Sequence, residues 1–272
     1  GSSGGGLYAD KTFDPKWDTN SEGKGYIVSL VLPGAATSII AFSGFTNLKE
    51  VSGGGIQIIS ESAFGGCTAL TSADFPAAVT IDRYAFRDCT ALTSVSLPAV
   101  TTIDRNAFYY CTALTSVSLP AVTTIGGAAF RDCTALTSIS FPAVTSIGSH
   151  AFYYCTALTS VSLPAVTSIG ADAFQHCTAL TSVSLPAVTS IGDYAFYYCT
   201  ALETLSLPDL PPSLGSGVFA LTGPEGKLTI LIDTQGGLRN YENNWWYDAS
   251  ADGDREMYGN KHKEIELTYI RR

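Results

Sequence analysis

The sequence has little of what nucleic-acid-binding and membrane-spanning proteins depend on. Only 14% of its 272 residues are charged, and the net charge of −9, with a pI near 4.7, leaves no excess of basic residues. A nucleic-acid partner is therefore not expected, because phosphate backbones are bound by basic stripes. No run of about 18 apolar residues occurs, so no membrane-spanning helix is expected.

Histidine is also scarce, and its three residues are His150, His176 and His262. No Ser-His-Asp or Cys-His set shares one coil in an arrangement recognisable as the machinery of nucleophilic catalysis. The abundant serines are periodic, which is typical of solvated strand positions. We therefore expect no catalytic residue, no cofactor and no enzymatic activity.

What the sequence has in abundance is a 22-residue repeat between Phe64 and Pro208, with copies such as AFYYCTALTSVSLPAVTTI and AFRDCTALTSISFPAVTSI. Phe recurs at positions 64, 86, 108, 130, 152, 174 and 196, and Cys follows three residues after each. A fixed period of this size predicts a solenoid, in which each coil buries its apolar face against its neighbours.

Each copy predicts one short strand and one short helix. In the copy from Ile103 to Pro120, apolar residues at helical spacing predict a helix over 104–110, with Asp104 as its N-cap. The segment TSVSL, before Pro120, alternates apolar and polar residues and predicts a strand that ends at the proline. We expect an α/β repeat whose strands pair in parallel along one side.

The repeat also predicts how the chain is divided. Residues 1–25 are expected to form a linker and an N-terminal cap, 26–220 the solenoid, and 221–272 a C-terminal cap. The first residues, GSSGGG, are typical of a flexible linker, as if a precursor had been trimmed.

The strand pattern LTSVSL and the motif LPxxVTxIxxxAFxxCxxL resemble the BspA-type, or Treponema-type, leucine-rich repeats of bacterial surface proteins. The resemblance covers about residues 26–232 and implies a right-handed leucine-rich-repeat solenoid that is capped at both ends. It also implies a secreted or cell-surface protein, lipid-anchored through a precursor segment. Some members of the family are adhesins that bind host matrix proteins. The family has no catalytic residues, and its motif does not specify binding residues.

The seven cysteines form one column, with one thiol per repeat. Equivalent side chains in a stack point the same way, so disulfides between neighbouring coils are not expected. Four ligands in a straight line cannot surround a zinc ion tetrahedrally. We interpret the column as buried thiols that act as small apolar side chains.

Two surfaces are candidates for binding. The serine columns, Ser94 to Ser182 and Ser96 to Ser206, should tile the strand side with hydroxyls, either as a solvated face or as a surface for glycan or protein docking. The two positions before each Cys differ most between copies, and alternation of like charges on adjacent coils is one structural explanation. Six tyrosines at these positions are expected to be exposed and are the preferred binding residues: Tyr109, Tyr110, Tyr153, Tyr154, Tyr197 and Tyr198.

One segment suggests a metal site. Asp248, Ser250, Asp252 and the following glycine match the opening of a calcium-binding loop, but the twelfth position is Gly259 instead of Glu. We interpret the segment as an acidic surface turn and keep its three side chains as a weak candidate.

These observations predict a monomeric, non-enzymatic cell-surface or secreted protein that binds another molecule, as an adhesin would. The alternatives are a glycan-capture protein and a structural stalk that displays another module. The ligand, protein or glycan, is not specified by the residues.

Overall fold

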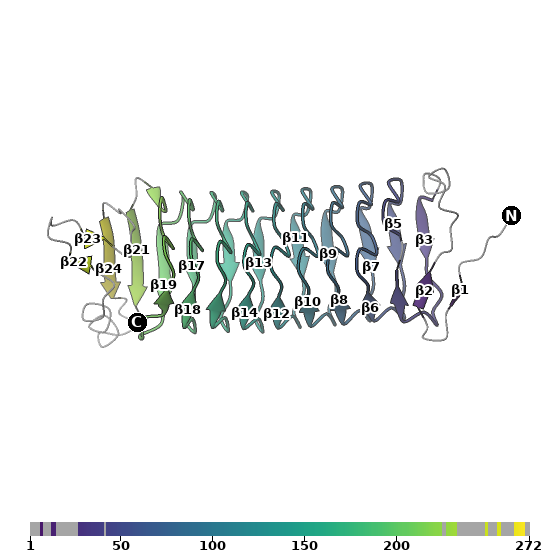
Figure 1. The fold of residues 1–272 in the computed structure, drawn as a ribbon, viewed down its shortest axis with the longest axis horizontal. Helices are drawn as coiled ribbons and strands as arrows, with labels where there is room; N and C mark the ends of the chain where they lie inside the picture. Colours follow the sequence, from purple (N-terminus) through teal and green to yellow (C-terminus); the bar gives the residue numbers. More distant parts are fainter. Residues whose placement is uncertain are drawn as a thin grey trace. The chain divides into compact units, whose positions relative to one another are not determined.

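The computed structural model describes residues 27–40, 42–224 and 227–232, together with strands at 6–7, 12–14, 248–249, 255–256 and 264–269. The chain divides into two compact units, Gly1–Leu136 and Thr137–Arg272. Each unit is built from coils of about 22 residues, and each regular coil has two short strands (Figure 1).

In the first unit, the longer strands hold three residues each and the shorter strands two. The longer ones are β3 (Ser29–Val31), β5 (Glu50–Ser52), β7 (Ser72–Asp74), β9 (Ser94–Ser96) and β11 (Ser116–Ser118). The shorter ones are β4 (Ser38–Ile39), β6 (Ile58–Ile59), β8 (Thr80–Ile81), β10 (Thr102–Ile103) and β12 (Thr124–Ile125). Near the N-terminus, β1 (Gly6–Leu7) pairs antiparallel with β2 (Thr12–Asp14), which pairs parallel with β4.

The second unit repeats this arrangement. Its longer strands are β13 (Ser138–Ser140), β15 (Ser160–Ser162), β17 (Ser182–Ser184), β19 (Thr204–Leu207), β21 (Lys227–Ile232) and β24 (Glu264–Tyr269), which form one sheet in this order. Its shorter strands are β14 (Ser146–Ile147), β16 (Ser168–Ile169), β18 (Ser190–Ile191) and β20 (Ser213–Leu214). A separate antiparallel pair joins β22 (Asp248–Ala249) to β23 (Arg255–Glu256).

In the regular coils the register of each parallel ladder is one 22-residue repeat. Ser94 pairs with Ser116 in the first unit, and Ser160 pairs with Ser182 in the second. Every position of the repeat therefore becomes a column of like residues along the coils. Parallel pairing of successive strands is thus confirmed, and so is the solenoid.

The core consists of these columns. Phe86, Phe108 and Phe130 are fully buried, and their rings stack at centroid distances of 5.2 and 5.1 Å. In the second unit, Phe174 stacks in the same way on Phe152 and Phe196. The periodic Leu, Ile, Ala and Cys positions complete the buried ribbon. Stacked aromatic pairs add to the stability that burial of apolar area supplies.

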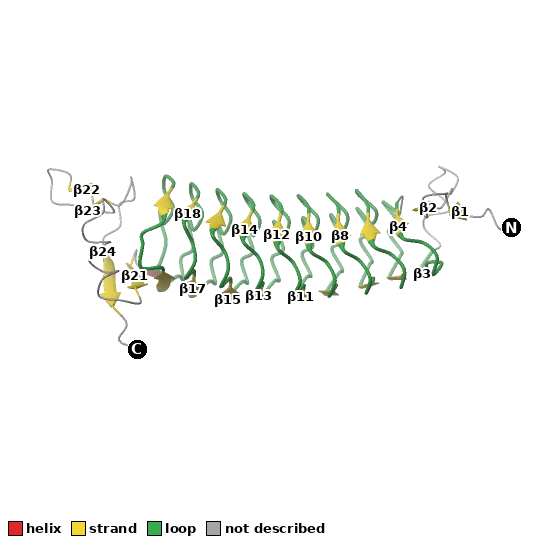
Figure 2. Cartoon of the chain, turned by 90° about the horizontal axis from the view of Figure 1, so that it is seen from below, coloured by secondary structure: helices red, strands yellow, loops and turns green. Residues whose placement is uncertain are grey.

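The predicted helix in each coil is wrong. Among the described residues there is no helix, and Figure 2 shows only strands and loops. In the segment predicted as helical over 104–110, Asn106 and Tyr110 have left-handed backbones, with φ of 56° and 61°. Residues with such φ values interrupt a right-handed helix.

The hydrogen bonds of this segment explain why it does not form a helix. The amides of Asn106, Phe108 and Tyr110 donate to carbonyls of the next coil at 2.8–3.0 Å. The alternate amides, those of Tyr109 and Cys111, donate three residues back within the turn. The backbone therefore satisfies half of its donors between coils, and the apolar spacing reflects a double turn. Asp104, expected as an N-cap, accepts a hydrogen bond from the amide of Arg105 at 2.6 Å.

Candidate functional site: an edge of aromatic side chains

The double turn presents a column of side chains just before the cysteine column. In the second unit we define the Tyr–His edge as five residues at these positions: Tyr153, Tyr154, His176, Tyr197 and Tyr198. Three of them have left-handed backbones, with φ of 58° for Tyr154, 61° for His176 and 58° for Tyr198. The turn therefore imposes an unusual backbone conformation on positions that carry large side chains.

The same column in the first unit shows which residues suit this backbone. Gly44 and Gly66 occupy it with φ of 75° and 74°, and Asp88 and Asp132 with φ of 59° and 60°. Glycine and aspartate are among the residues that tolerate left-handed backbones best. Histidine is also enriched on left-handed backbones, whereas tyrosine is not. The backbone alone therefore does not explain the tyrosines, and strained positions of this kind concentrate at functional sites.

The rings of the Tyr–His edge pack against one another. The imidazole of His176 stacks on Tyr154 at a centroid distance of 4.3 Å, with an angle of 26° between planes. On its other side it contacts Tyr198 at 4.8 Å. Tyr153 and Tyr197 lie against the same imidazole edge-on, at 6.1 and 5.9 Å. His176 is therefore the centre of the cluster.

The predicted exposure of the six tyrosines holds for the second residue of each pair. Tyr110, Tyr154 and Tyr198 are 46%, 37% and 40% exposed. The first residue of each pair, Tyr109, Tyr153 or Tyr197, is half-buried, because its ring packs on neighbouring side chains. Each pair thus combines an anchored ring with a projecting one.

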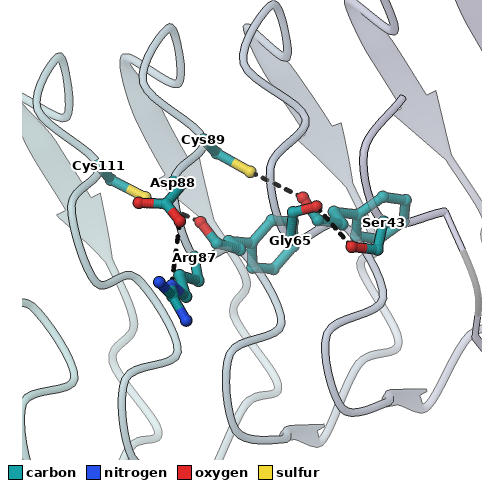
Figure 3. Close-up of polar contacts among 8 residues, drawn as sticks. Ser43, Gly65, Arg87, Asp88, Cys89 and Cys111 are labelled. Carbon is teal, nitrogen blue, oxygen red and sulfur yellow. Dashed lines mark hydrogen bonds and ion pairs between the residues drawn. The ribbon is translucent and has the colours of Figure 1, made fainter. Parts of the chain in front are cut away.

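The corresponding edge of the first unit is more polar. Tyr109 lies between two guanidinium groups, with Arg87 at 5.6 Å and Arg131 at 5.8 Å from its ring centroid. Each arginine also pairs with the aspartate that follows it, at 3.0 Å for Asp88 and 3.3 Å for Asp132 (Figure 3 shows the first pair). These contacts keep the arginine side chains along the edge and neutralise their charge.

Two further side chains belong to this surface and were not predicted from the sequence. His176 stands in the repeat position of the second tyrosine, which is the signal that could have identified it. His150 pairs with Asp172 across 3.4 Å, and its ring lies 5.5 Å from that of Tyr153. Burial lowers the pKa of His176, so its neutral form predominates near pH 7.

The serine columns lie on the strand side, as predicted. Ser94, Ser96, Ser116 and Ser118 are exposed in the first unit, as are the serines of β13, β15 and β17 in the second. A shallow depression of about 230 Å³ opens over the second unit's sheet. It is lined by Ser160, Val161, Ser182, Val183, Ser184, Thr204, Ser206 and Leu231.

The seven cysteines are buried thiols that form no disulfide, and they have a structural role. Cys89 donates a hydrogen bond to the Phe64 carbonyl at 3.2 Å, and Cys111 donates to Phe86 at 3.1 Å (Figure 3). In the second unit, the Thr222 hydroxyl takes the place of the thiol and donates to Phe196 at 2.6 Å. Burial raises the pKa of Cys199 to about 12, which keeps it protonated at neutral pH.

The weak metal candidate is untested. Asp248 lies in β22, and Ser250 and Asp252 lie outside the described residues. Within the described part of the chain, no three His, Cys, Asp or Glu side chains gather as metal ligands would. Among these same residues, no helix is long and apolar enough to cross a membrane.

Comparison with solved structures identifies similar solenoids. A leucine-rich-repeat protein from Bacteroides ovatus matches with a TM-score of 0.68 and 24% identity, over 89% of this chain and 61% of that one. A leucine-rich-repeat protein from T. pallidum matches with a TM-score of 0.55 and 31% identity, over 58% of this chain and 79% of that one. This chain thus spans less than two thirds of the B. ovatus protein. No curated protein matches the sequence.

The family comparison covers most of the chain. The model of the BspA type leucine-rich repeat region matches residues 24–137 and 101–224, with six copies. The matched residues include the Phe and Cys columns and every turn that carries the aromatic side chains. The chain belongs to the BspA-type leucine-rich-repeat family.

Proposed function

We propose that this protein is a non-enzymatic interaction protein of the bacterial cell surface that binds a protein partner, as an adhesin does. The membership of the BspA-type family supports an interaction role on a repeat scaffold. We further propose that the protein is held at the surface by a lipid anchor on a precursor segment.

The observation that carries the proposal is the placement of aromatic side chains on left-handed backbones. Tyr110, Tyr154 and Tyr198 occupy positions where glycine or aspartate stands in other coils. A left-handed backbone costs an ordinary residue about 1–2 kcal/mol. Exposed tyrosines are also the residue type that protein interfaces favour. A binding role for these tyrosines would account both for their left-handed backbones and for their exposure.

The ring geometry favours a protein over a sugar at this edge. Tyr154 and the imidazole of His176 face each other across 4.3 Å, so the two facing ring surfaces are already occupied. Ring edges and phenol hydroxyls, which suit polypeptide side chains and backbone, are open to a partner. A sugar stacks on a ring face, and one face of each of these two rings is closed to it.

A second candidate is glycan capture on the strand side. The depression over β15, β17, β19 and β21 favours it, because its lining presents serine and threonine hydroxyls. A stalk that displays another module remains as the third alternative, and it would require no binding by either surface.

A paired binding screen tests these alternatives. The intact protein is applied to immobilised purified matrix proteins and to a glycan array. The matched variant replaces Ser160, Ser182 and Ser184 by alanine. We expect capture by one or more proteins, with no loss in the serine variant. Binding to glycans alone, abolished in the serine variant, would contradict the proposal. Binding to neither panel would support the alternative of a structural stalk.

A further inference from the structure

The position of His176 gives the Tyr–His edge a titratable centre. Its imidazole is the middle of three consecutive rings, between Tyr154 at 4.3 Å and Tyr198 at 4.8 Å. The two half-buried tyrosines, Tyr153 and Tyr197, close the cluster from the sides. Histidine is the side chain whose charge ordinarily changes between pH 5 and 8.

We propose that protonation of His176 loosens the Tyr–His edge, so that binding through this edge is strong at neutral pH and weak in acid. This inference rests on the proposed function for its effect on binding, but the ring rearrangement is independent of any ligand. The neutral imidazole packs as one ring among five. The imidazolium carries a charge that the packed rings partly shield from water. Outward movement of the ring therefore lowers its free energy, because the charge is hydrated again.

The groups that face His176 do not supply a counter-charge. From the preceding coil these are the phenols of Tyr153 and Tyr154, and from the following coil those of Tyr197 and Tyr198. The carboxylate of Asp172, on the same turn, pairs with His150. The carboxylate of Asp193 accepts a hydrogen bond from the amide of Ser216 at 2.7 Å.

Two effects compete when His176 gains a proton. Burial disfavours the charged ring, and it is the cause of the lowered pKa. Attraction between a cation and the faces of Tyr154 and Tyr198 would favour the charged ring. Because the folded pKa is lowered, the stabilisation by the stack is present above the unfolded value of about 6.5 and is lost as the pH falls through the folded pKa.

The first test follows the rings without a ligand. With three histidines in the chain, NMR of labelled imidazoles can be assigned with the variants His176→Gln and His150→Gln. We expect His176 to titrate below about 6.5, and the ring signals of Tyr154 and Tyr198 to move with the same midpoint. A midpoint above that value, with tyrosine signals unmoved, would overturn the inference while leaving the proposed function intact.

The second test measures binding between pH 7.5 and 5.0 to a matrix protein captured in the screen. If only the neutral form binds, affinity falls about tenfold for each pH unit below the pKa of His176. The variant His176→Phe keeps a stacking ring and should bind without this pH dependence, whereas His150→Gln should retain it. Equal pH dependence in His176→Phe and the intact protein would refute the inference. Failure to capture any protein refutes the proposed function, and the NMR titration still decides the ring rearrangement.

Discussion

Substitution of Leu221 would measure directly how much a left-handed backbone lowers the stability of the fold. Leu221 lies in the second unit, where it continues the column of Tyr198 in the next coil, with φ of 53°, and its side chain is 58% exposed. Asparagine tolerates this backbone, so Leu221→Asn should relieve about 1–2 kcal/mol. Loss of the partly buried apolar side chain should offset about 0.5–1 kcal/mol of that gain. The expected net effect is a stabilisation of about 0.5–1 kcal/mol.

Leu210→Asn is the matched control. Leu210 is 72% exposed and is not among the residues with positive φ, so the control loses apolar contact without relieving strain. Leu221→Asn should exceed the control in stability by about 1–2 kcal/mol in urea denaturation followed by circular dichroism. Hydrogen exchange of the Tyr198 amide, which donates to the Ala220 carbonyl at 3.0 Å, reports the same coil locally. Equal stability of the two variants would refute the argument that these positions are strained.

Two further predictions concern the core. Phe108→Ala should destabilise by about 3–5 kcal/mol through lost burial and a cavity, since its ring is stacked on both sides at 5.2 and 5.1 Å. Phe42→Ala, in an outer coil, should cost less in the same denaturation experiment, and equal losses would contradict a graded linear array. The seven buried thiols should resist a thiol reagent in the native protein and all react after unfolding without reductant. Fewer than seven reactive groups in the unfolded chain would reveal a disulfide.

The periodicity of the sequence was enough to predict the solenoid and its buried columns. Phe108, Cys111 and Leu114 recur at a constant step of 22 residues, and such a step is typical of a solenoid, in which equivalent residues stack. The parallel register follows from the same step. Val117 and Leu119 alternate with serines and were expected to point inward; Leu119 is buried, whereas Val117 is half-buried.

The local structure of the turn could not be predicted in the same way. Apolar residues at 103, 107, 108 and 111 satisfy helical spacing, but they satisfy a double turn equally well. The choice between a helix and a double turn is made by hydrogen bonds from the amides of Phe108 and Tyr110 to the next coil. These bonds connect residues 21 apart in sequence. The second strand of each coil was missed because two residues, such as Thr102–Ile103, carry no periodic signal.

The candidate site was predicted in part. The tyrosine pairs were identified because they vary where the rest of the repeat is constant. The central place of His176 was not predicted, because it depends on ring contacts between coils. The left-handed backbone was missed for the same reason as the double turn.

The most direct test of the proposed binding role replaces the six tyrosines and measures stability and binding on the same sample. Tyr110, Tyr154 and Tyr198 are replaced by asparagine, which suits their backbone, and Tyr109, Tyr153 and Tyr197 by serine. Relief of strain should offset lost ring contacts, so the urea midpoint should change little. Capture of the matrix proteins found in the screen should be abolished. Normal capture by a folded variant would contradict the central claim, and so would unfolding of the variant, which would show that the tyrosines serve the fold.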